Sequence, residues 1–525
     1  MAAVGELLGQ VDEVAARPVG HSDLSQRLAE AGLLPMFGFP TRSRLLYRSI
    51  PKKTFPWPPA DSVNRDLAVA LSKFAPGSET PQDGRLLRSS GVVSLVPSGR
   101  GVQAAEEPFG PEQLVAMCRI CSHVDPQAVV DPETGDAGTC PACGAESKYY
   151  RAVPFREPAG FRAAREARDY DGYRELGSNA TSARTATDLE KTAPRIHRAA
   201  DDWMVVHTGS GDRYIVNTNA GKLFRFAKNT GPWRGYLALD NPKAEADLEI
   251  ALGATQHTDM LFIGAKDALD TDRGLRFDIS KSQQIDGFPE AYHGRRAAWY
   301  SLAALLRRAA APHLDVQPEE LLSGIHGSDA PVAAPVMAYL ADSLDNGAGF
   351  STHLGSEEHI EEFLRAVDRY MHDLEADHHA RNCRSSCYAC LRDYSNMRLH
   401  PLYDWRLARD LTDALRGRTL RIDPDEHAVL LRGWADEEAD VILKETAAGP
   451  VALFTSDFTG EPVAVAVKHP LESAAEECGN ERLRALRHEV RAGGLATRIA
   501  FADSYGLDRT PAAVIEQVHT FAEDL

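Results

Sequence analysis

The sequence predicts an α+β protein made of several domains. The chain has 525 residues, more than one hydrophobic core usually organises. Short β-type segments separated by turn residues dominate up to about residue 290, and longer helical segments follow. Seven of the eight cysteines form two tight clusters, a pattern typical of small units that are stabilised by a metal ion. We therefore expect several small units rather than one large core.

The charge balance limits the classes of function. The formal net charge is −18, so the protein is not expected to coat nucleic acid by bulk electrostatic attraction, although this charge leaves room for local basic patches. Residues 1–16 lack the basic and apolar regions of a secretory signal, and no apolar run reaches membrane-spanning length. These features predict a cytoplasmic protein with no membrane partner, whose cysteines stay reduced.

The first cysteine cluster has the spacing of a zinc ribbon. Two CxxC turns, separated by eighteen residues, supply four thiolates that can surround one Zn(II) tetrahedrally. No coordination position is left open, so the metal is expected to be structural and to stabilise the fold. The predicted ligands are Cys118, Cys121, Cys140 and Cys143.

The second cluster offers three thiolates, Cys383, Cys387 and Cys390, in a C-x3-C-x2-C pattern. A tetrahedral zinc site needs a fourth ligand, and His379 before the cluster and His400 after it are equally good candidates. The alternative is an iron–sulfur cluster completed by the distant Cys478. We expect a second structural zinc, which makes two in all.

Local patterns predict the elements between the clusters. We expect a helix over residues 61–74, a hairpin turn at residues 83–84 and a polar linker over residues 163–200. Short strands over residues 203–207, 213–216 and 223–226, with a turn at residues 209–211, predict a small antiparallel sheet. The glycines of these turns do not match a phosphate-binding loop.

Helical periodicity is strongest in the second half. Residues 292–310 are predicted to form a helix with an apolar face and solvated arginines near its ends, and residues 360–374 form the clearest apolar stripe. Between them, the glycine-rich turn of residues 342–350 serves either close packing or the binding of an anion at a helix start. After Gly417, strands over residues 451–454 and 463–467 and a helix over residues 481–491 predict an α/β appendage.

The segment CYACLRDYSNMRLHPLYDWRLARDL resembles the core of the MrfA-like zinc-binding domain, found in the C-terminal region of large DEAD/DEAH-box helicases. The earlier RDLAVALSKFAPGSE and the 342–350 turn resemble other parts of those helicase tails, so the resemblance covers roughly residues 30–420. It departs from the full-length helicases by having no motor domains in front, and from some versions by having three cysteines instead of four. The matching positions are Cys383, Cys387, Cys390, Tyr394, Asn396, His400, Asp404, Trp405 and Arg406.

The function expected from the residues and the resemblance is not enzymatic. The chain contains no P-loop, so no catalytic residue is predicted. The resemblance implies a zinc-binding accessory protein that binds DNA and partners in trans with a DEAD/DEAH-type helicase, in DNA repair or defence against phage. The alternative is a metal-dependent nuclease in the appendage, using Asp457 and Lys468, although Ala466 stands where such sites need an acidic ligand. A helicase remnant without function is a third, weaker possibility.

Taken together, these patterns predict five consecutive parts. They are a helicase-tail-like segment (1–110), a zinc ribbon (111–150), a linker with a β-rich domain (151–290), a helical zinc-binding domain (291–420) and the α/β appendage (421–525).

Overall fold

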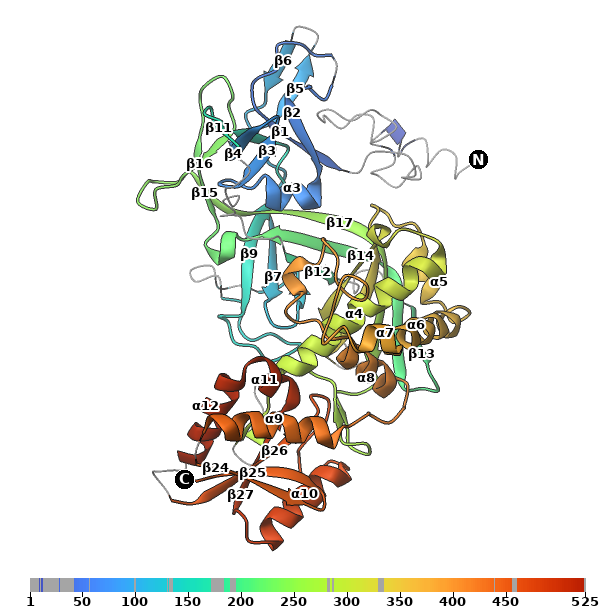
Figure 1. Ribbon diagram of the computed structural model, residues 1–525. Coiled ribbons are helices and arrows are strands. Elements are labelled where there is room, and N and C mark those ends of the chain that lie inside the picture. The colour runs from blue at the N-terminus through green and yellow to red at the C-terminus, as the bar shows by residue number, and fades with distance from the viewer. Residues whose placement is uncertain are drawn as a thin grey trace.

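The computed structural model describes residues 9, 11–12, 28, 42–55, 57–98, 101–129, 131, 136–170, 184–188, 195–280, 284–285, 288–328, 335–438, 440–455 and 460–523. The fold is mixed α/β, with an upper β-rich part, a central part and a lower C-terminal part (Figure 1). Asp457, named above for the nuclease alternative, lies outside the described residues.

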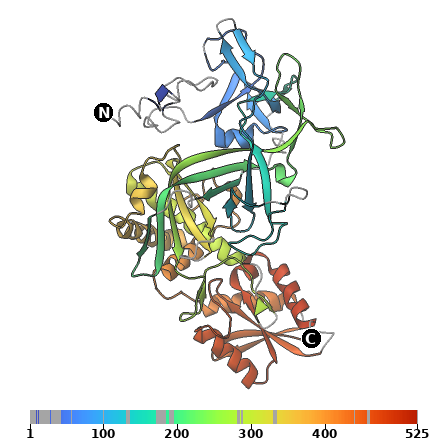
Figure 2. The same ribbon diagram turned by 180° about the vertical axis from the view of Figure 1, so that it is seen from behind.

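Two long strands organise the sheet. β14 (Met204–Asn217) and β17 (Leu248–Ala265) run antiparallel, in continuous register from Met204 opposite Ala265 to Asn217 opposite Leu252. Both cross the back of the molecule (Figure 2). Gly209 pairs with Met260, so the turn predicted at residues 209–211 is wrong. The expected small sheet is part of a 17-stranded sheet, because long-range pairing with β17 keeps the local glycines extended.

The upper part surrounds a separate core that includes Leu71, Phe74 and Phe161. The predicted helix over residues 61–74 begins only at Leu67, where Asp66 caps α3 (Leu67–Lys73), because the residues before it pair with the first strand. The predicted turn at residues 83–84 is confirmed, since it joins two paired strands. The elements here are β1 (Ser43–Tyr47), β2 (Ser62–Asp66), β3 (Glu79–Gln82), β4 (Arg85–Val92), β5 (Leu95–Ser98), β6 (Gly101–Ala104), β10 (Phe161–Ala163), β11 (Arg168–Asp169), β15 (Phe224–Lys228) and β16 (Tyr236–Ala238).

The central part continues the sheet on both sides of the long strands. β7 (Gln113–Cys118) pairs with β9 (Tyr150–Arg156), which in turn pairs with β17. β12 (Arg184–Asp188) and β13 (Arg195–Ala199) pair with β14, so the segment predicted as a linker contributes strands. The remaining strands are β8 (Val124–Asp125), β22 (Leu321–Gly327) and β23 (Val336–Asp342).

Helices cover one side of this sheet. Nearly every turn of α4 (His293–Leu314) is buried, and it contacts β22, β23, α6 and α8. Arg295 and Arg307 are buried within it, so the prediction of solvated arginines is wrong for these two. The apolar stripe predicted over residues 360–374 is confirmed in α6. The other helices are α5 (Phe350–Leu354), α6 (Ile360–Glu375), α7 (Asp377–Ala380) and α8 (Trp405–Leu415).

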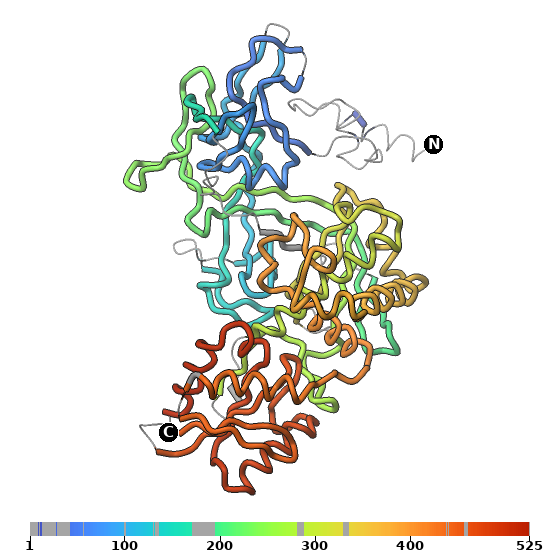
Figure 3. The backbone as a smooth tube through the Cα atoms, in the orientation of Figure 1, coloured from blue at the N-terminus to red at the C-terminus, as the bar shows by residue number. Residues whose placement is uncertain are grey.

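The C-terminal part is a four-stranded sheet with helices on both faces. Figure 3 shows this part, in orange to red, below the rest of the chain. Three strands form an antiparallel meander and the fourth lies parallel to the third. Leu483 and Val490 of α10 pack on one face, and Trp434 and Val518 of α9 and α12 on the other. The elements are α9 (Pro424–Glu437), β24 (Val441–Thr446), β25 (Gly449–Thr455), β26 (Pro462–Lys468), α10 (Glu481–Ala492), β27 (Arg498–Asp503), α11 (Ser504–Arg509) and α12 (Pro511–Glu523).

Short hairpins, β18 (Leu269–Asp270) with β19 (Leu275–Arg276) and β20 (Gln284–Ile285) with β21 (Phe288–Pro289), connect the long strands to α4. A bridge between Leu275 and Glu472 ties this region to the C-terminal part. Among the residues that the structure describes, no helix has the length and apolar character needed to span a bilayer.

Candidate metal centres and an arginine-lined cavity

The first cysteine group lies at the end of β7 and in the two turns beyond it. The Sγ atoms of Cys118 and Cys143 are 3.6 Å apart, and those of Cys121 and Cys140 are 3.7 Å apart. Tetrahedral zinc with Zn–S bonds of about 2.3 Å separates its sulfurs by about 3.8 Å. All four side chains are buried, and their sulfurs lie within 4.8 Å of one another. The geometry therefore fits a closed structural site.

Electrostatics favours a cation at this position. Hydrogen bonding from Cys121 and the other two thiols lowers the pKa of Cys118, whereas burial raises the pKa of Cys121. Four buried thiolates cannot all ionise side by side unless a positive ion compensates their charge.

The second group combines His379 of α7 with Cys383, Cys387 and Cys390, all within 4.8 Å of one another. Its Sγ–Sγ distances are 3.9 Å from Cys383 to Cys390 and 3.7 Å from Cys387 to Cys390. His379 Nε2 lies 3.6 Å from the Cys387 Sγ, and its Nδ1 lies 2.8 Å from the Leu374 carbonyl. Donation from Nδ1 to that carbonyl leaves the Nε2 lone pair facing the thiols, as a metal ligand requires.

His400 and Cys478 lie elsewhere. His400 Nε2 is 2.8 Å from the Asn396 Oδ1 and 3.0 Å from the Asp393 carbonyl, so His400 supports the turn at residues 393–396, between the cysteines and itself. Cys478 is buried in the C-terminal part, where its thiol contacts Ser473. Neither belongs to the two groups that the structure brings together among its described residues.

The glycine turn before α5 does not present an open helix start. The Asp342 carboxylate accepts hydrogen bonds from the backbone N–H groups of Ala348, Phe350 and Ser351. The chain therefore supplies its own anion at this helix start.

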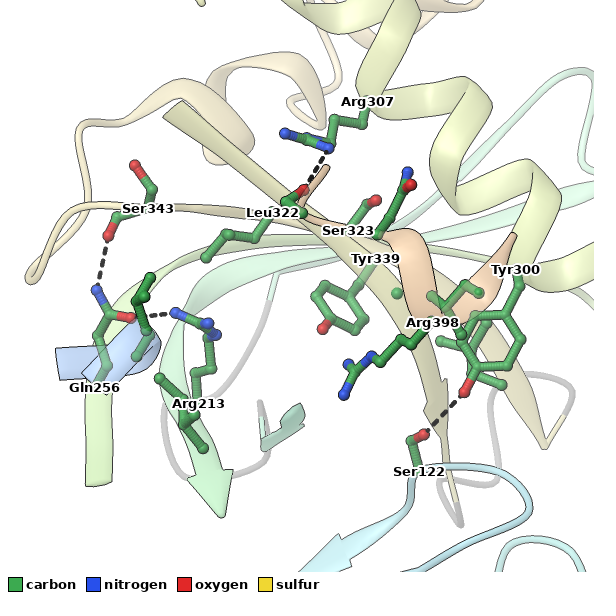
Figure 4. Close-up of a pocket in the computed structure, with 18 of the residues that line it drawn as sticks. Ser122, Arg213, Gln256, Tyr300, Arg307, Leu322, Ser323, Tyr339, Ser343 and Arg398 are labelled. Carbon is green, nitrogen blue, oxygen red and sulfur yellow. Dashed lines mark hydrogen bonds between the residues drawn. The ribbon is translucent and has the colours of Figure 1, made fainter. Parts of the chain in front are cut away.

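A cavity of about 880 Å³ lies between the two metal-binding segments. One wall contains Cys118, Arg119 and Ser122 of the first segment, and another contains residues 395–403, which follow the second. Tyr300 of α4 spans the gap, because its hydroxyl is 3.4 Å from the Ser122 hydroxyl (Figure 4). Two of the walls thus adjoin the two groups of candidate metal ligands.

The lining carries an excess of positive charge. Six arginines and three carboxylates line the cavity, in a chain whose net charge is −18. Two of the arginines also form ion pairs with carboxylates outside the lining, Arg42 with Glu157 and Arg307 with Asp393. The arginines are Arg42, Arg119, Arg213, Arg296, Arg307 and Arg398, and the carboxylates are Asp66, Glu319 and Asp345. Such a local basic surface is the electrostatic condition for binding an anionic ligand.

Sequence reasoning missed this cavity. Arg213 was predicted only as part of a short strand, and Arg398 carried no prediction beyond lying in the segment that resembles the zinc-binding domain. The available signal was the charged Arg213 at the start of the strand segment RYIVN. Arg213 shares a strand face with Ile215 and Asn217, both of which are buried.

Lys468 of the appendage is also buried, and its ammonium lies 3.3 Å from Glu290 and donates to the Glu472 carbonyl at 2.8 Å. These contacts hold its ammonium inside the protein.

No protein-family model and no curated protein matches the chain significantly. Among solved structures it is similar to the DUF1998 helicase MrfA bound to DNA, with 10% identity and a TM-score of 0.29, over 68% of this chain and 32% of that one. A second structure, MrfA bound to DNA and AMPPNP, gives 9% identity and a TM-score of 0.23, over 67% and 30% of the two chains. The chain thus spans about a third of the length of these neighbours, and similarity this distant does not place it in their family.

Proposed function

We propose that the chain is a non-enzymatic, zinc-binding accessory protein that binds DNA and acts in trans with a DEAD/DEAH-type helicase. The observation that carries the proposal is the arginine-rich cavity walled by two metal-binding segments. Zinc is the proposed metal, because groups of four thiolates and of three thiolates with one imidazole are its usual structural ligands.

Each part of the site has a role in this proposal. The metals hold the cavity walls without an open coordination position, and so supply rigidity rather than chemistry. Arginines from the sheet, from α4 and from the second metal-binding segment contact phosphate oxygens. The resemblance of residues 383–406 to helicase tails motivates the helicase partner and a role in DNA repair or phage defence.

DNA binding is tested first, with the purified zinc-loaded chain and a labelled oligonucleotide at several salt concentrations. Affinity should fall steeply as salt rises, because phosphate contacts release counterions. Absence of binding at low salt would overturn the DNA-binding part of the proposal.

Helicase partnership is tested separately, by co-expressing the tagged chain with the helicase encoded nearest to it. A stable complex, with ATP hydrolysis only when the helicase is present, is expected. ATP hydrolysis or metal-dependent DNA cleavage by the chain alone would contradict the accessory role.

A further inference from the structure

Arg213 is a buried guanidinium without an ionic partner. The residue is 7% exposed and lies on β14 at the wall of the cavity. Its Nη1 donates to the Gln256 amide oxygen, and its Nε has no hydrogen-bond partner. Among the described residues, no carboxylate forms an ion pair with it, and Asp66 and Asp345 of the same lining act on its charge only from a longer distance.

The surroundings hold Arg213 in this position. The amide nitrogen of Gln256 donates to the Ser343 carbonyl at 2.8 Å, which fixes the amide oxygen toward the guanidinium. Burial lowers the pKa of Arg213, but an arginine side chain does not lose its proton in proteins. A charge that is buried, oriented and unable to neutralise itself calls for an anion from outside the chain.

The neighbouring groups narrow the chemistry of that anion. Figure 4 shows Arg213, Tyr339 and Arg398 extending into the same space from β14, β23 and the turn after the second metal-binding segment. Burial raises the pKa of Tyr339, so its hydroxyl remains a hydrogen-bond donor. Tyr300, half-buried on α4, presents a ring at the other side. Guanidinium groups suit a phosphate, and tyrosine rings suit an unstacked base.

The depth of the cavity determines whether single-stranded or duplex DNA can reach Arg213. A duplex is a stiff rod that carries its phosphates on its outside, and its bases are stacked within it. A rigid duplex can touch the exposed Arg398 at the rim but not a guanidinium that is 93% buried. An unpaired strand bends freely and can place one nucleotide inside a cavity of about 880 Å³.

We infer that the cavity receives an unpaired nucleotide of single-stranded DNA, with its phosphate on Arg213 and Arg398 and its base beside Tyr300. This inference rests on the proposed function and adds the strandedness and the contact residues.

The test compares a short labelled single-stranded oligonucleotide with the matching duplex, by fluorescence anisotropy on the zinc-loaded full chain. Arg213→Gln should weaken single-strand binding by about 10- to 100-fold, the usual effect of losing charge-assisted hydrogen bonds. The single-strand affinity of Arg213→Lys should lie between that of the native chain and that of Arg213→Gln. The control Arg491→Gln removes an exposed arginine of α10, outside the cavity, and should change affinity by less than about 2-fold.

A second variant guards against misfolding. Arg398→Gln lies on the exposed rim and should weaken the same binding while zinc content and unfolding temperature stay unchanged. The inference is overturned if both cavity variants bind the single strand as the native chain does, or if the duplex binds as tightly with the same dependence on Arg213. DNA binding that ignores these variants removes the inference alone, whereas absence of all DNA binding removes the proposed function as well.

Discussion

Two of the regions in which the protein buries arginines treat that charge differently. At the junction with the C-terminal part, Arg276, Arg295 and Lys468 surround the carboxylate of Glu290. In the cavity, Arg213 is also enclosed, but its direct side-chain partner is the neutral amide of Gln256, and the carboxylates of Asp66 and Asp345 act on it only from beyond ion-pairing distance. The first arrangement is complete within the chain, and the second is completed by a ligand. A buried charge therefore indicates a functional site only when the chain does not provide its ion-pair partners.

The junction is a structural connection. Lys468 belongs to β26 and Arg295 to α4, so Glu290 joins the C-terminal sheet to the central helices. Burial raises the pKa of Glu290, but Lys468, Arg295 and Arg276 lower it by more, so the net pKa lies below the usual value. This carboxylate stabilises the fold when ionised, and that stabilisation is lost as the pH falls through its folded pKa.

Metal removal should have the largest effect and should separate the two regions. Chelation is expected to release about two zinc ions per chain and to abolish DNA binding, because apparent folding contributions of structural zinc reach about 10 kcal/mol. The Glu290 junction contains no metal ligand and should persist longer under limited proteolysis. Metal analysis by mass spectrometry checks the stoichiometry.

Single-residue variants refine this prediction. Cys118→Ser and His379→Gln should each lose one metal, whereas His400→Gln and Cys478→Ser should keep both. Loss of metal from His400→Gln, with retention by His379→Gln, would show that the second centre is wrongly assigned.

Glu290→Gln should have the next largest effect. It leaves three buried cations around a neutral amide, and breaking a buried ion pair in this way typically costs about 3–5 kcal/mol. Urea unfolding of this variant is compared with that of Glu358→Gln, which removes the same single negative charge from an exposed position. A loss below about 1 kcal/mol would mean that the junction is not held by Glu290.

His207 is a buried basic side chain of a third kind, because its imidazole stays neutral at pH 7. Burial, with Arg198 and His197 nearby, lowers its pKa to about 4. The unfolded chain binds this proton near pH 6.5 and the folded chain does not, so the stability present above that pH is lost on acidification. We expect about 2 kcal/mol less stability at pH 5 than at pH 7 from this group, and a smaller loss in His207→Gln. An equal pH dependence in both proteins would refute the assignment.

Arg213→Gln should have the smallest effect on stability. It removes a buried charge with no carboxylate partner, so the free energy of unfolding should change by less than about 1 kcal/mol or increase. If this variant lost as much stability as Glu290→Gln, Arg213 would be a structural residue and the contrast between the two regions would disappear.

Some of the site could be predicted because it is encoded locally. Two CxxC turns define four ligands by their spacing, and the apolar stripe of α6 follows from helical periodicity. The choice between His379 and His400 was open, because both lie near the cysteines in sequence. It depends on where α7 ends and on the Leu374 carbonyl that orients the imidazole.

Long-range pairing accounts for most of the rest. Gly209 and Gly211 favour a turn locally, but β17 keeps β14 extended through both of them. The cavity joins walls from residues more than 250 positions apart, such as Arg119 and Arg398, and no local pattern reports such proximity. The burial of Arg307 was missed for the same reason, since its partner Asp393 comes from the segment after Cys390.

The most direct measurement is ultraviolet cross-linking of a single-stranded oligonucleotide to the zinc-loaded chain, with the linked peptides mapped by mass spectrometry. Cross-links are expected at the cavity, on the peptides that contain Tyr300, Tyr339 and Tyr403, and should disappear in Arg213→Gln. Cross-links confined to the outer faces of the molecule, and unchanged in that variant, would contradict the account.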